Sequence, residues 1–545
     1  MPQDASGPGT PSNVQPTSPE TEPRDSGTRA PKSIAFRLSI LAIVVNLFLY
    51  ALDATTLAVA APAIAADLEG TSLESFWASI LYLLGVVITQ PLYAALSDIF
   101  GRKAPLYVAY LFFLAGSLAF ALAPNMGSII AGRLLQGLGG GGLDVLSEII
   151  ITDMTTLQER PLYLGLVAIP TAVGSVLGPT AGGLFSSLVT WRWLGWINIP
   201  LLAISSTLVV FFLRLRAPPQ TSLPSKLRSL DWTGTSFFTA GTVLFILPLS
   251  WAGNLYPWDS FRTLLPLLLG AGILIAFAVY ERRPSLPVIP YRIFHSRTPV
   301  SALVGVFFHG MSLYSLLQWL PLLYQAVALE TVLQSAVTLL PTSAVSVLSA
   351  VAGVAIVGVA NIGYRWSIRL SWLFTVVGTG VLVLLDANSS ANLRRGLPII
   401  WGAGIGSLLR LLVLPLQASV LHVDDTSLAI GILLTFRLLG GLVGLAICST
   451  LFTSIFSQSI AKIESLPEAL SVLQSPNEAI AFIPVLRSIH LPEETLLAIR
   501  EAYLSAIRVI LYAMTGFSGL GLLSSFFTRD LDLRKTEIGQ QQFDG

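Results

Sequence analysis

Long runs of apolar residues, separated by short polar or charged segments, are the main pattern of this sequence of 545 residues. Fourteen runs have a length of about 18 to 25 residues, which an α-helix needs to cross the hydrocarbon core of a bilayer. They form a group of six, a group of two and a second group of six. The runs lie near residues 36–58, 76–96, 106–123, 128–151, 162–188, 196–213, 232–251, 264–280, 300–320, 334–359, 368–385, 397–420, 428–456 and 503–527. The pattern predicts an all-α polytopic membrane protein with fourteen transmembrane helices.

The polar segments between these runs divide the chain into expected domains. The N-terminal segment is rich in Pro, Ser, Thr and Gly and has no apolar run, so we expect it to be disordered. The expected order is a cytoplasmic tail (1–33), a six-helix bundle (34–213), a cytoplasmic linker (214–231), two inserted spans (232–283), a second six-helix bundle (284–527) and a cytoplasmic tail (528–545). An external loop, residues 457–501, interrupts the second bundle, and its periodic apolar positions predict amphipathic helices on the membrane surface.

The distribution of Lys and Arg predicts the orientation of the chain, since positively charged loops remain in the cytoplasm. With the N-terminal tail inside, the inner segments hold about twenty of these residues and the outer loops about seven. Both termini are therefore expected in the cytoplasm, with the protein in the cell membrane; the vacuolar membrane is the alternative. The sole N-x-[ST] sequence then places a glycosylation acceptor, Asn388, on the outer side.

Composition narrows the function. Hydrophobic residues make up 53% of the chain and charged residues only 11%, whereas soluble proteins carry about 25% charged residues. Lys and Arg number 31 and Asp and Glu 30, so the net charge suggests no nucleic-acid partner. A single cysteine, Cys448, excludes an intrachain disulfide and a cysteine metal cluster, and we expect neither a metal nor a cofactor.

Motif searches argue against an enzyme. The sequence has no G-x-x-x-x-G-K-[ST] nucleotide-binding loop and no H-E-x-x-H or G-x-S-x-G motif. A transporter built from this chain must therefore take its energy from a gradient.

Charged residues inside the predicted spans are the first candidates for function, because an intramembrane charge is expensive and needs a partner or a watery cavity. Asp53 in the first span and Arg133 in the fourth lie at similar depths from the outer side, so they are expected to form a pair in the pore. Asp144 and Glu148 lie one helical turn apart in the fourth span, on roughly the same face as Arg133. We predict that these four residues couple transport to protons. Arg410 and Arg437 are further intramembrane cations.

The loop after the second span has the sequence A-A-L-S-D-I-F-G-R-K from Ala94 to Lys103. It resembles the loop signature G-x-L-x-D-R-x-G-R-K of the major facilitator superfamily, and Ala94 and Ile99 differ from that pattern. In the family this loop is a charge latch between the two halves. The resemblance therefore implies a conformational latch made by Asp98, Gly101, Arg102 and Lys103; on chemistry alone the loop is only a basic segment that sets topology.

Further strings resemble the fourteen-span drug:proton antiporter branch of this superfamily. They are L-D-A-T from Leu52, R-x-x-Q-G from Arg133, G-S-V-L-G-P-T-A-G-G from Gly174, the W-R-W and N-I-P strings near Asn198, and F-R-L-L-G-G from Phe436. The resemblance implies an antiporter hinge in the fifth span and cavity residues in both halves. The hinge residues are Gly174, Gly178, Pro179, Gly182 and Gly183, and the cavity candidates are Gln136, Gln417, Arg437 and Trp319. The alternative interpretation is that the hinge glycines form a face on which another helix packs closely.

The resemblance implies the major facilitator fold, in which two six-helix bundles surround a central cavity and two further spans are inserted between them. It also implies a monomeric, proton-coupled exporter of hydrophobic or amphipathic small molecules, similar to fungal pumps for drugs, toxins and secondary metabolites. Its partners are then the small-molecule substrate, protons and the lipid bilayer. The alternatives are an importer or vacuolar transporter of siderophores or basic amino acids, and a receptor that does not transport.

Overall fold

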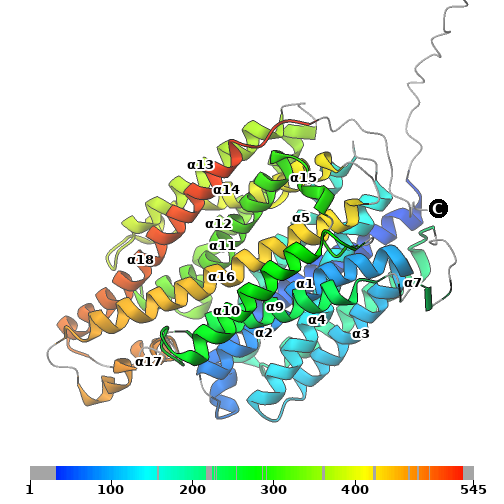
Figure 1. The fold of residues 1–545 in the computed structure, drawn as a ribbon. Coiled ribbons are helices and arrows are strands. Elements are labelled where there is room, and N and C mark those ends of the chain that lie inside the picture. Colours follow the sequence, from blue (N-terminus) through cyan, green and yellow to red (C-terminus); the bar gives the residue numbers. More distant parts are fainter. Residues whose placement is uncertain are drawn as a thin grey trace, which may run out of the picture.

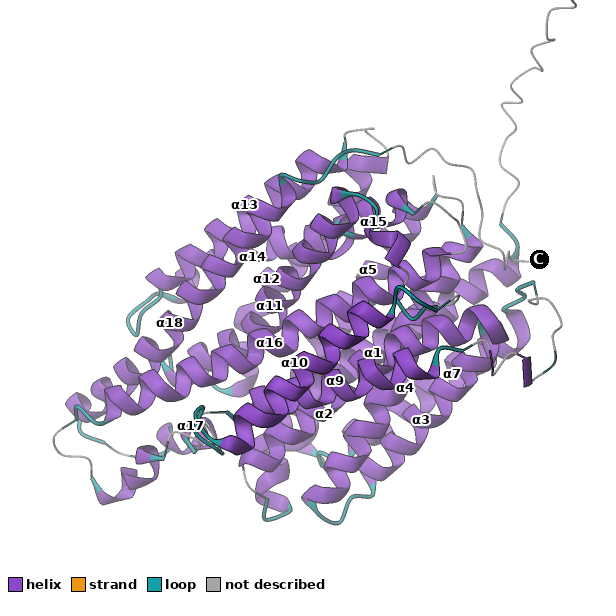
Figure 2. Ribbon diagram, in the orientation of Figure 1, coloured by secondary structure: helices purple, strands orange, loops and turns teal. Residues whose placement is uncertain are grey.

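The structure of the chain is a computed structural model, and Figure 1 shows its helices side by side along one long axis. It describes residues 32–70, 72–155, 159–216, 222, 224–225, 228, 230–252, 255–284, 287–289, 291–358, 363–420, 425–463, 467–475, 478–489 and 491–531. Figure 2 shows that the described part is helices joined by loops, without a β-sheet. In that part, 14 helices are long and apolar enough to cross a membrane. The N-terminal tail up to residue 31 and the C-terminal tail from residue 532 lie outside the described residues.

The first six spans form the N-terminal half of the molecule. They are α1 (Ile34–Asp67), α2 (Ser72–Phe100), α3 (Lys103–Ala121), α4 (Met126–Met154), α5 (Arg160–Leu188) and the pair α6 (Trp193–Trp196) and α7 (Asn198–Phe212). Side-chain caps begin two of them, because free N–H groups at a helix start need acceptors: Ser33 accepts from Phe36 and Asn125 from Ser128. In α4, 83% of the residues in its apolar membrane-crossing stretch are buried, so this helix is the centre of the half.

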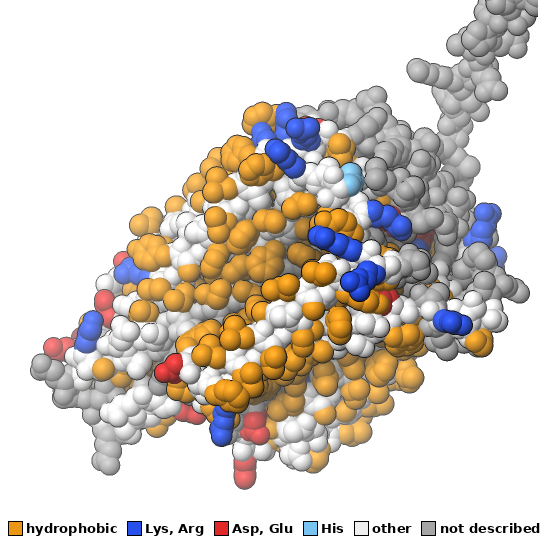
Figure 3. All heavy atoms as spheres, in the orientation of Figure 1, with side chains coloured by type: hydrophobic (Ala, Val, Ile, Leu, Met, Phe, Trp, Pro, Cys, Tyr) orange, Lys and Arg blue, Asp and Glu red, His pale blue; other side chains and the backbone are white. Residues whose placement is uncertain are grey.

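Two helices then stand between the halves, α9 (Trp232–Trp251) and α10 (Phe261–Tyr280). They pack on each other, and α9 also contacts α2 of the first half and α16 (Thr426–Ile460) of the second. Only 17% of the residues in the apolar membrane-crossing stretch of α10 are buried, so the surface of this helix is available to lipid. Figure 3 shows this broad apolar face in orange, with Lys and Arg side chains mainly toward the end where the C-terminus lies.

The last six spans form the C-terminal half. After η1 (Tyr291–Phe294) they are α11 (Arg297–Ala326), α12 (Val332–Gly358), α13 (Tyr364–Val381) with η2 (Leu382–Leu384), α14 (Ala391–Leu411) with α15 (Val413–Ser419), α16, and α18 (Glu493–Ser525). The expected single helix over 397–420 is interrupted between α14 and α15, because Pro415 has no N–H to donate to the carbonyl of Leu411. The two halves meet where α5 packs on α12 and α2 packs on α16.

The external segment differs from expectation in length and in packing. Helix α16 continues to Ile460 and α18 begins at Glu493, so the connection is shorter than residues 457–501. Its two short helices, η4 (Glu468–Gln474) and α17 (Ala479–Leu486), bury Leu470 and Phe482 in one apolar cluster with Phe456 and Tyr503. Part of its apolar surface therefore packs on the ends of α16 and α18.

The predicted orientation can be tested by labelling with a membrane-impermeant maleimide, since Cys448, the natural cysteine, is buried. Ser457 is exposed near the end of α16 that joins the external segment, and His295 is exposed next to η1 at the other end of the second half. In intact cells Ser457→Cys should be labelled and the matched variant His295→Cys should not. Permeabilising the cells should expose His295→Cys. The reverse pattern would contradict cytoplasmic termini.

Candidate functional site

A cavity of about 140 Å³ lies between the two halves. Helices α1, α4 and α5 supply one part of its lining, and α11, α12, α14 and α16 supply the other. The polar and charged lining residues are Tyr50, Thr55, Asp144, Glu148, Thr171, Ser175, Tyr314, Thr342, Ser343, Ser346, Arg410 and Arg437. Most other lining residues are apolar, for example Leu313, Leu317, Leu320 and Leu438. The lining is thus largely apolar but holds two acids and two arginines.

One acid and one arginine of the cavity form an ion pair across the halves. Arg410 on α14 donates from Nη1 to Oε1 of Glu148 on α4, and their side chains are 2% and 5% exposed. The other terminal nitrogen of Arg410 lies 3.3 Å from the carbonyl oxygen of Val167 on α5. Breaking a buried pair of this kind leaves an uncompensated charge, so the contact holds the two halves together in this arrangement.

The other acid and the other arginine make no ion pair within the described residues. Oδ2 of Asp144 accepts a hydrogen bond of 2.8 Å from the side-chain amide of Gln90. Arg437 donates from Nη2 to the carbonyl oxygen of Leu409 over 2.9 Å. Its Nε has no partner among the described residues, although the side chain is only 6% exposed. These two charged groups are therefore held by neutral partners while they face a cavity.

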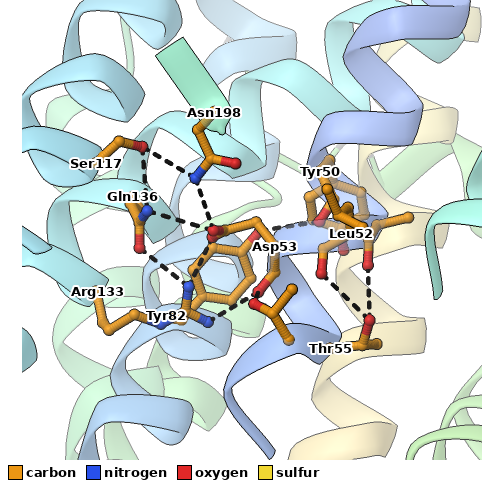
Figure 4. Close-up of polar contacts among 11 residues, drawn as sticks. Tyr50, Leu52, Asp53, Thr55, Tyr82, Ser117, Arg133, Gln136 and Asn198 are labelled. Carbon is orange, nitrogen blue, oxygen red and sulfur yellow. Dashed lines mark hydrogen bonds and ion pairs between the residues drawn. The ribbon is translucent and has the colours of Figure 1, made fainter. Parts of the chain in front are cut away.

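The expected pair of Asp53 and Arg133 is formed, with 2.6 Å between Arg133 Nη1 and Asp53 Oδ2 (Figure 4). The second carboxylate oxygen, Oδ1, accepts from the amides of Gln136 at 3.3 Å and Asn198 at 2.9 Å. Both amides also donate to the hydroxyl of Ser117, at 3.1 and 3.2 Å. Helices α1, α3, α4 and α7 are thus joined by one buried polar network.

This network lies behind the wall of the cavity and does not line it, which corrects the expectation that Asp53 and Arg133 face the pore. Tyr82 on α2 separates the two sites. Its ring centroid lies 4.1 Å from the guanidinium carbon of Arg133, and its hydroxyl donates to the carbonyl oxygen of Tyr50 at 3.3 Å. Tyr50 in turn lines the cavity and interacts with Tyr314 of the other half. A continuous set of contacts therefore joins the network to the cavity.

The predicted latch residues meet at one end of the first half. Gly101 has a φ of 85°, which favours glycine, and this turn brings Arg102 back over the helix ends. Arg102 donates from Nε to Asp153 over 2.7 Å, and from Nη1 to Ser97 and Asp98. Burial lowers the pKa of the Arg102 guanidinium, but the carboxylates of Asp153 and Asp98 raise it, and the net shift is upward. The guanidinium stays charged. Lys103 is the first residue of α3.

Ala94 stands where the family's loop signature has glycine, and a glycine of the other half, Gly431, faces it. A Cβ added to Gly431 on α16 would lie 2.9 Å from the Cβ of Ala94. The α2–α16 interface therefore keeps close approach by placing glycine on the opposite helix. Sequence reasoning missed Gly431, as it missed Ser117 and Asp153, because no local pattern identifies a partner on a distant helix. Asn198 begins the N-I-P string that resembles the antiporter branch, and the structure shows that its side-chain amide donates to Asp53.

The hinge glycines lie along the contact between α5 and α1. A Cβ on Gly174 would lie 2.7 Å from the carbonyl oxygen of Phe48, and one on Gly178 would lie 2.0 Å from Oγ1 of Thr55. A Cβ on Gly182 would come within 2.4 Å of the carbonyl oxygen of Thr56. Pro179, also inside α5, cannot donate to the preceding turn, and Gly183 follows Gly182 in the same helix. The packing interpretation therefore explains three of these glycines directly.

Of the four cavity candidates, Arg437 lines this cavity and the other three lie elsewhere. Gln136 belongs to the Asp53 network. Trp319 packs on Phe452, with 4.9 Å between ring centroids, inside the second half. Gln417 is buried on α15, and its side-chain oxygen and nitrogen have no partner among the described residues. Asn388 is exposed in the loop before α14, as a glycosylation acceptor must be.

Comparisons with known proteins agree with this architecture. Residues 43–445 match the sequence model described as Major Facilitator Superfamily. The chain is 51% identical over 528 residues to the MFS-type transporter sphD of Aspergillus fumigatus, covering 96% of this chain and 91% of that one. It is 32% identical over 518 residues to efflux pump FUS6 of Gibberella moniliformis, covering 94% and 91%.

Among solved structures, the fold is similar to that of a bacterial homologue of the human lysosomal transporter Spinster. The TM-score is 0.57 at 14% identity, and the match covers 91% of this chain and 98% of that one. This likeness concerns the fold alone. The sequence match over most of the chain, the fourteen spans and the cavity between two six-helix halves together show that the chain belongs to the Major Facilitator Superfamily of membrane transporters.

Proposed function

We propose that this protein is a proton-coupled exporter of hydrophobic or amphipathic small molecules. The observation that carries the proposal is the cavity between the halves, where an apolar lining surrounds the acids Asp144 and Glu148. An apolar wall favours an apolar cargo, and carboxyl groups inside the membrane are suited to exchange protons. Export is supported by relatives such as FUS6, which is named an efflux pump.

The geometry favours Asp144 as the residue that exchanges the proton. Asp144 lines the cavity and is held by one amide, whereas the carboxylate of Asp53 accepts from Arg133, Gln136 and Asn198. Both oxygens of the Asp53 carboxylate are thus occupied by donors, one of them cationic, and none of these groups lines the cavity. We therefore assign Asp144 to proton exchange and the Asp53–Arg133 network to transmitting the change within the first half.

The ion pair of Glu148 and Arg410 is proposed as an inner gate. The halves also touch where Ala94 meets Gly431, at the end of α2 that leads to the Arg102 loop. With the termini in the cytoplasm, these contacts close the cytoplasmic side. Alternating access then requires the pair to open when the cavity turns inward. We further propose that the protein acts as a monomer in the cell membrane.

Everted membrane vesicles test the proposed activity, because their lumen corresponds to the outside of the cell. Nile red, a neutral apolar dye, should accumulate in the lumen when the lumen is acidic, and accumulation should stop when the gradient is collapsed. Vesicles without the protein are the control for partition into lipid. Equal accumulation with and without the gradient would reject proton coupling.

Two variants in the same vesicles locate the proton. Asp144→Asn should lower gradient-driven accumulation to the level of vesicles without the protein, because the exchanging carboxyl group is lost. Asp53→Asn should keep gradient dependence but transport slowly, since it weakens a network behind the cavity. Full gradient dependence in Asp144→Asn, together with its loss in Asp53→Asn, would reverse the two assignments.

The gate is tested by breaking and then reversing its charges. Glu148→Gln leaves Arg410 buried without its counter-ion, so the purified protein should lose about 3 kcal/mol of stability and melt at a lower temperature. Glu148→Arg combined with Arg410→Glu should recover most of the loss. A melting temperature unchanged in Glu148→Gln would contradict the role of this pair.

The latch is tested by Arg102→Ala, which removes contacts to Asp98 and Asp153. The variant should reach the membrane at the parental level but transport Nile red several-fold more slowly, because the residue stabilises a conformation and does not contact cargo. Arg37→Ala, which removes an exposed cation of α1 outside the latch, is the matched control for loss of one positive charge. Parental transport by Arg102→Ala would leave the loop with a topological role only.

A further inference from the structure

The unpaired charges of the cavity indicate what kind of cargo fits it. Asp144 belongs to α4 of the first half and Arg437 to α16 of the second, and both line the same cavity. Within the described residues, neither side chain makes an ion pair. In both cases the direct partner is neutral: an amide for Asp144 and a backbone carbonyl for Arg437.

A guanidinium that is buried without a carboxylate is unusual, because desolvation of its charge is then only partly offset. Nε of Arg437 has no hydrogen-bond partner in the part of the chain that the structure describes, and the side chain is 6% exposed. The remaining arginine of the cavity, Arg410, is occupied by Glu148. Arg437 is thus the available donor for an anionic group, and Asp144 is the available acceptor for a cationic group.

We propose that the cargo is an amphoteric amphiphile, with a head group that carries both an amine and a carboxylate and with an apolar chain. This inference rests on the proposed function and adds a substrate class to it. The ammonium group binds Asp144, and the carboxylate binds Arg437. The apolar chain lies along leucines of α11 such as Leu313, Leu317 and Leu320, which line the same cavity.

An amphoteric head group also explains coupling, which a simple anion does not. A proton on Asp144 and a cargo ammonium both neutralise the same carboxylate, so the two compete and exchange is antiport. A plain anion on Arg437 would bind better when Asp144 is protonated, which would couple proton and cargo in the same direction. The titratable and charged groups that face the cavity are Tyr50, Asp144, Glu148, Tyr314, Arg410 and Arg437.

The test uses one dodecyl chain with four head groups: α-aminododecanoate, dodecanoate, dodecylamine and dodecanol. Purified protein in lipid nanodiscs is titrated with each probe below its micelle concentration, and ligand-induced thermal stabilisation reports binding. α-Aminododecanoate should bind at least about tenfold more tightly than any other probe, because it makes two charge-assisted contacts. Its binding should also weaken as the pH falls, when protons occupy Asp144.

Variants assign each end of the head group. Arg437→Gln should lower the affinity for α-aminododecanoate to that for dodecylamine, and Asp144→Asn should lower it to that for dodecanoate. Arg437→Lys, which keeps the charge, should recover part of the loss and shows that the site still folds. Arg365→Gln removes a cation outside the cavity, near Asp530, and should change nothing. If Arg437 only balances the charge of Asp144 and does not bind cargo, Arg437→Gln will not lower the affinity for any probe that carries a carboxylate. That result would show that the proposal is wrong.

Binding is measured without a gradient, so the two proposals fail separately. Gradient-driven accumulation of Nile red, with equal binding of the four probes, would reject the amphoteric cargo and keep the transporter. Selective binding of α-aminododecanoate, without gradient-driven accumulation of either α-aminododecanoate or Nile red, would reject proton-coupled export and keep the head-group site.

Discussion

A charged side chain inside the bilayer needs a partner, and this constraint determines the arrangement of the whole protein. A single unpaired charge at the centre of a span costs about 2.5 to 3.5 kcal/mol. In the first half, Asp53 and Arg133 meet this requirement with each other and with the amides of Gln136 and Asn198. In the interface between the halves, Glu148 and Arg410 meet it across α4 and α14.

The two pairs differ in what surrounds them, and this difference separates their roles. The Asp53 pair is enclosed within one half, where it joins four helices and makes them a unit. The Glu148 pair joins helices from different halves beside a cavity, where a shift of one half against the other separates the charges. The first pair therefore suits a structural element that moves as one body, and the second suits a contact that opens and closes.

Close approach of helices is the second physical element of the fold. The glycines of α5 let its backbone touch the backbone of α1, and Gly431 on α16 allows contact with Ala94 on α2. Such contacts place backbone and side-chain groups at short, defined distances, which the proposed transmission from the cavity wall to the buried network requires. Tyr82, between Tyr50 and Arg133, is the residue through which the network contacts that wall.

The sequence by itself determined the span pattern, the family and the pairing of Asp53 with Arg133, because these depend on apolar length, local motifs and depth in the membrane. Tertiary structure decided which of the candidate side chains face the cavity: Asp144 and Arg437 do, whereas Asp53 and Trp319 do not. The direction of a side chain depends on how each helix is rotated against distant helices. That rotation is set by packing between residues far apart in the chain, such as Ala94 and Gly431, and no local pattern records it.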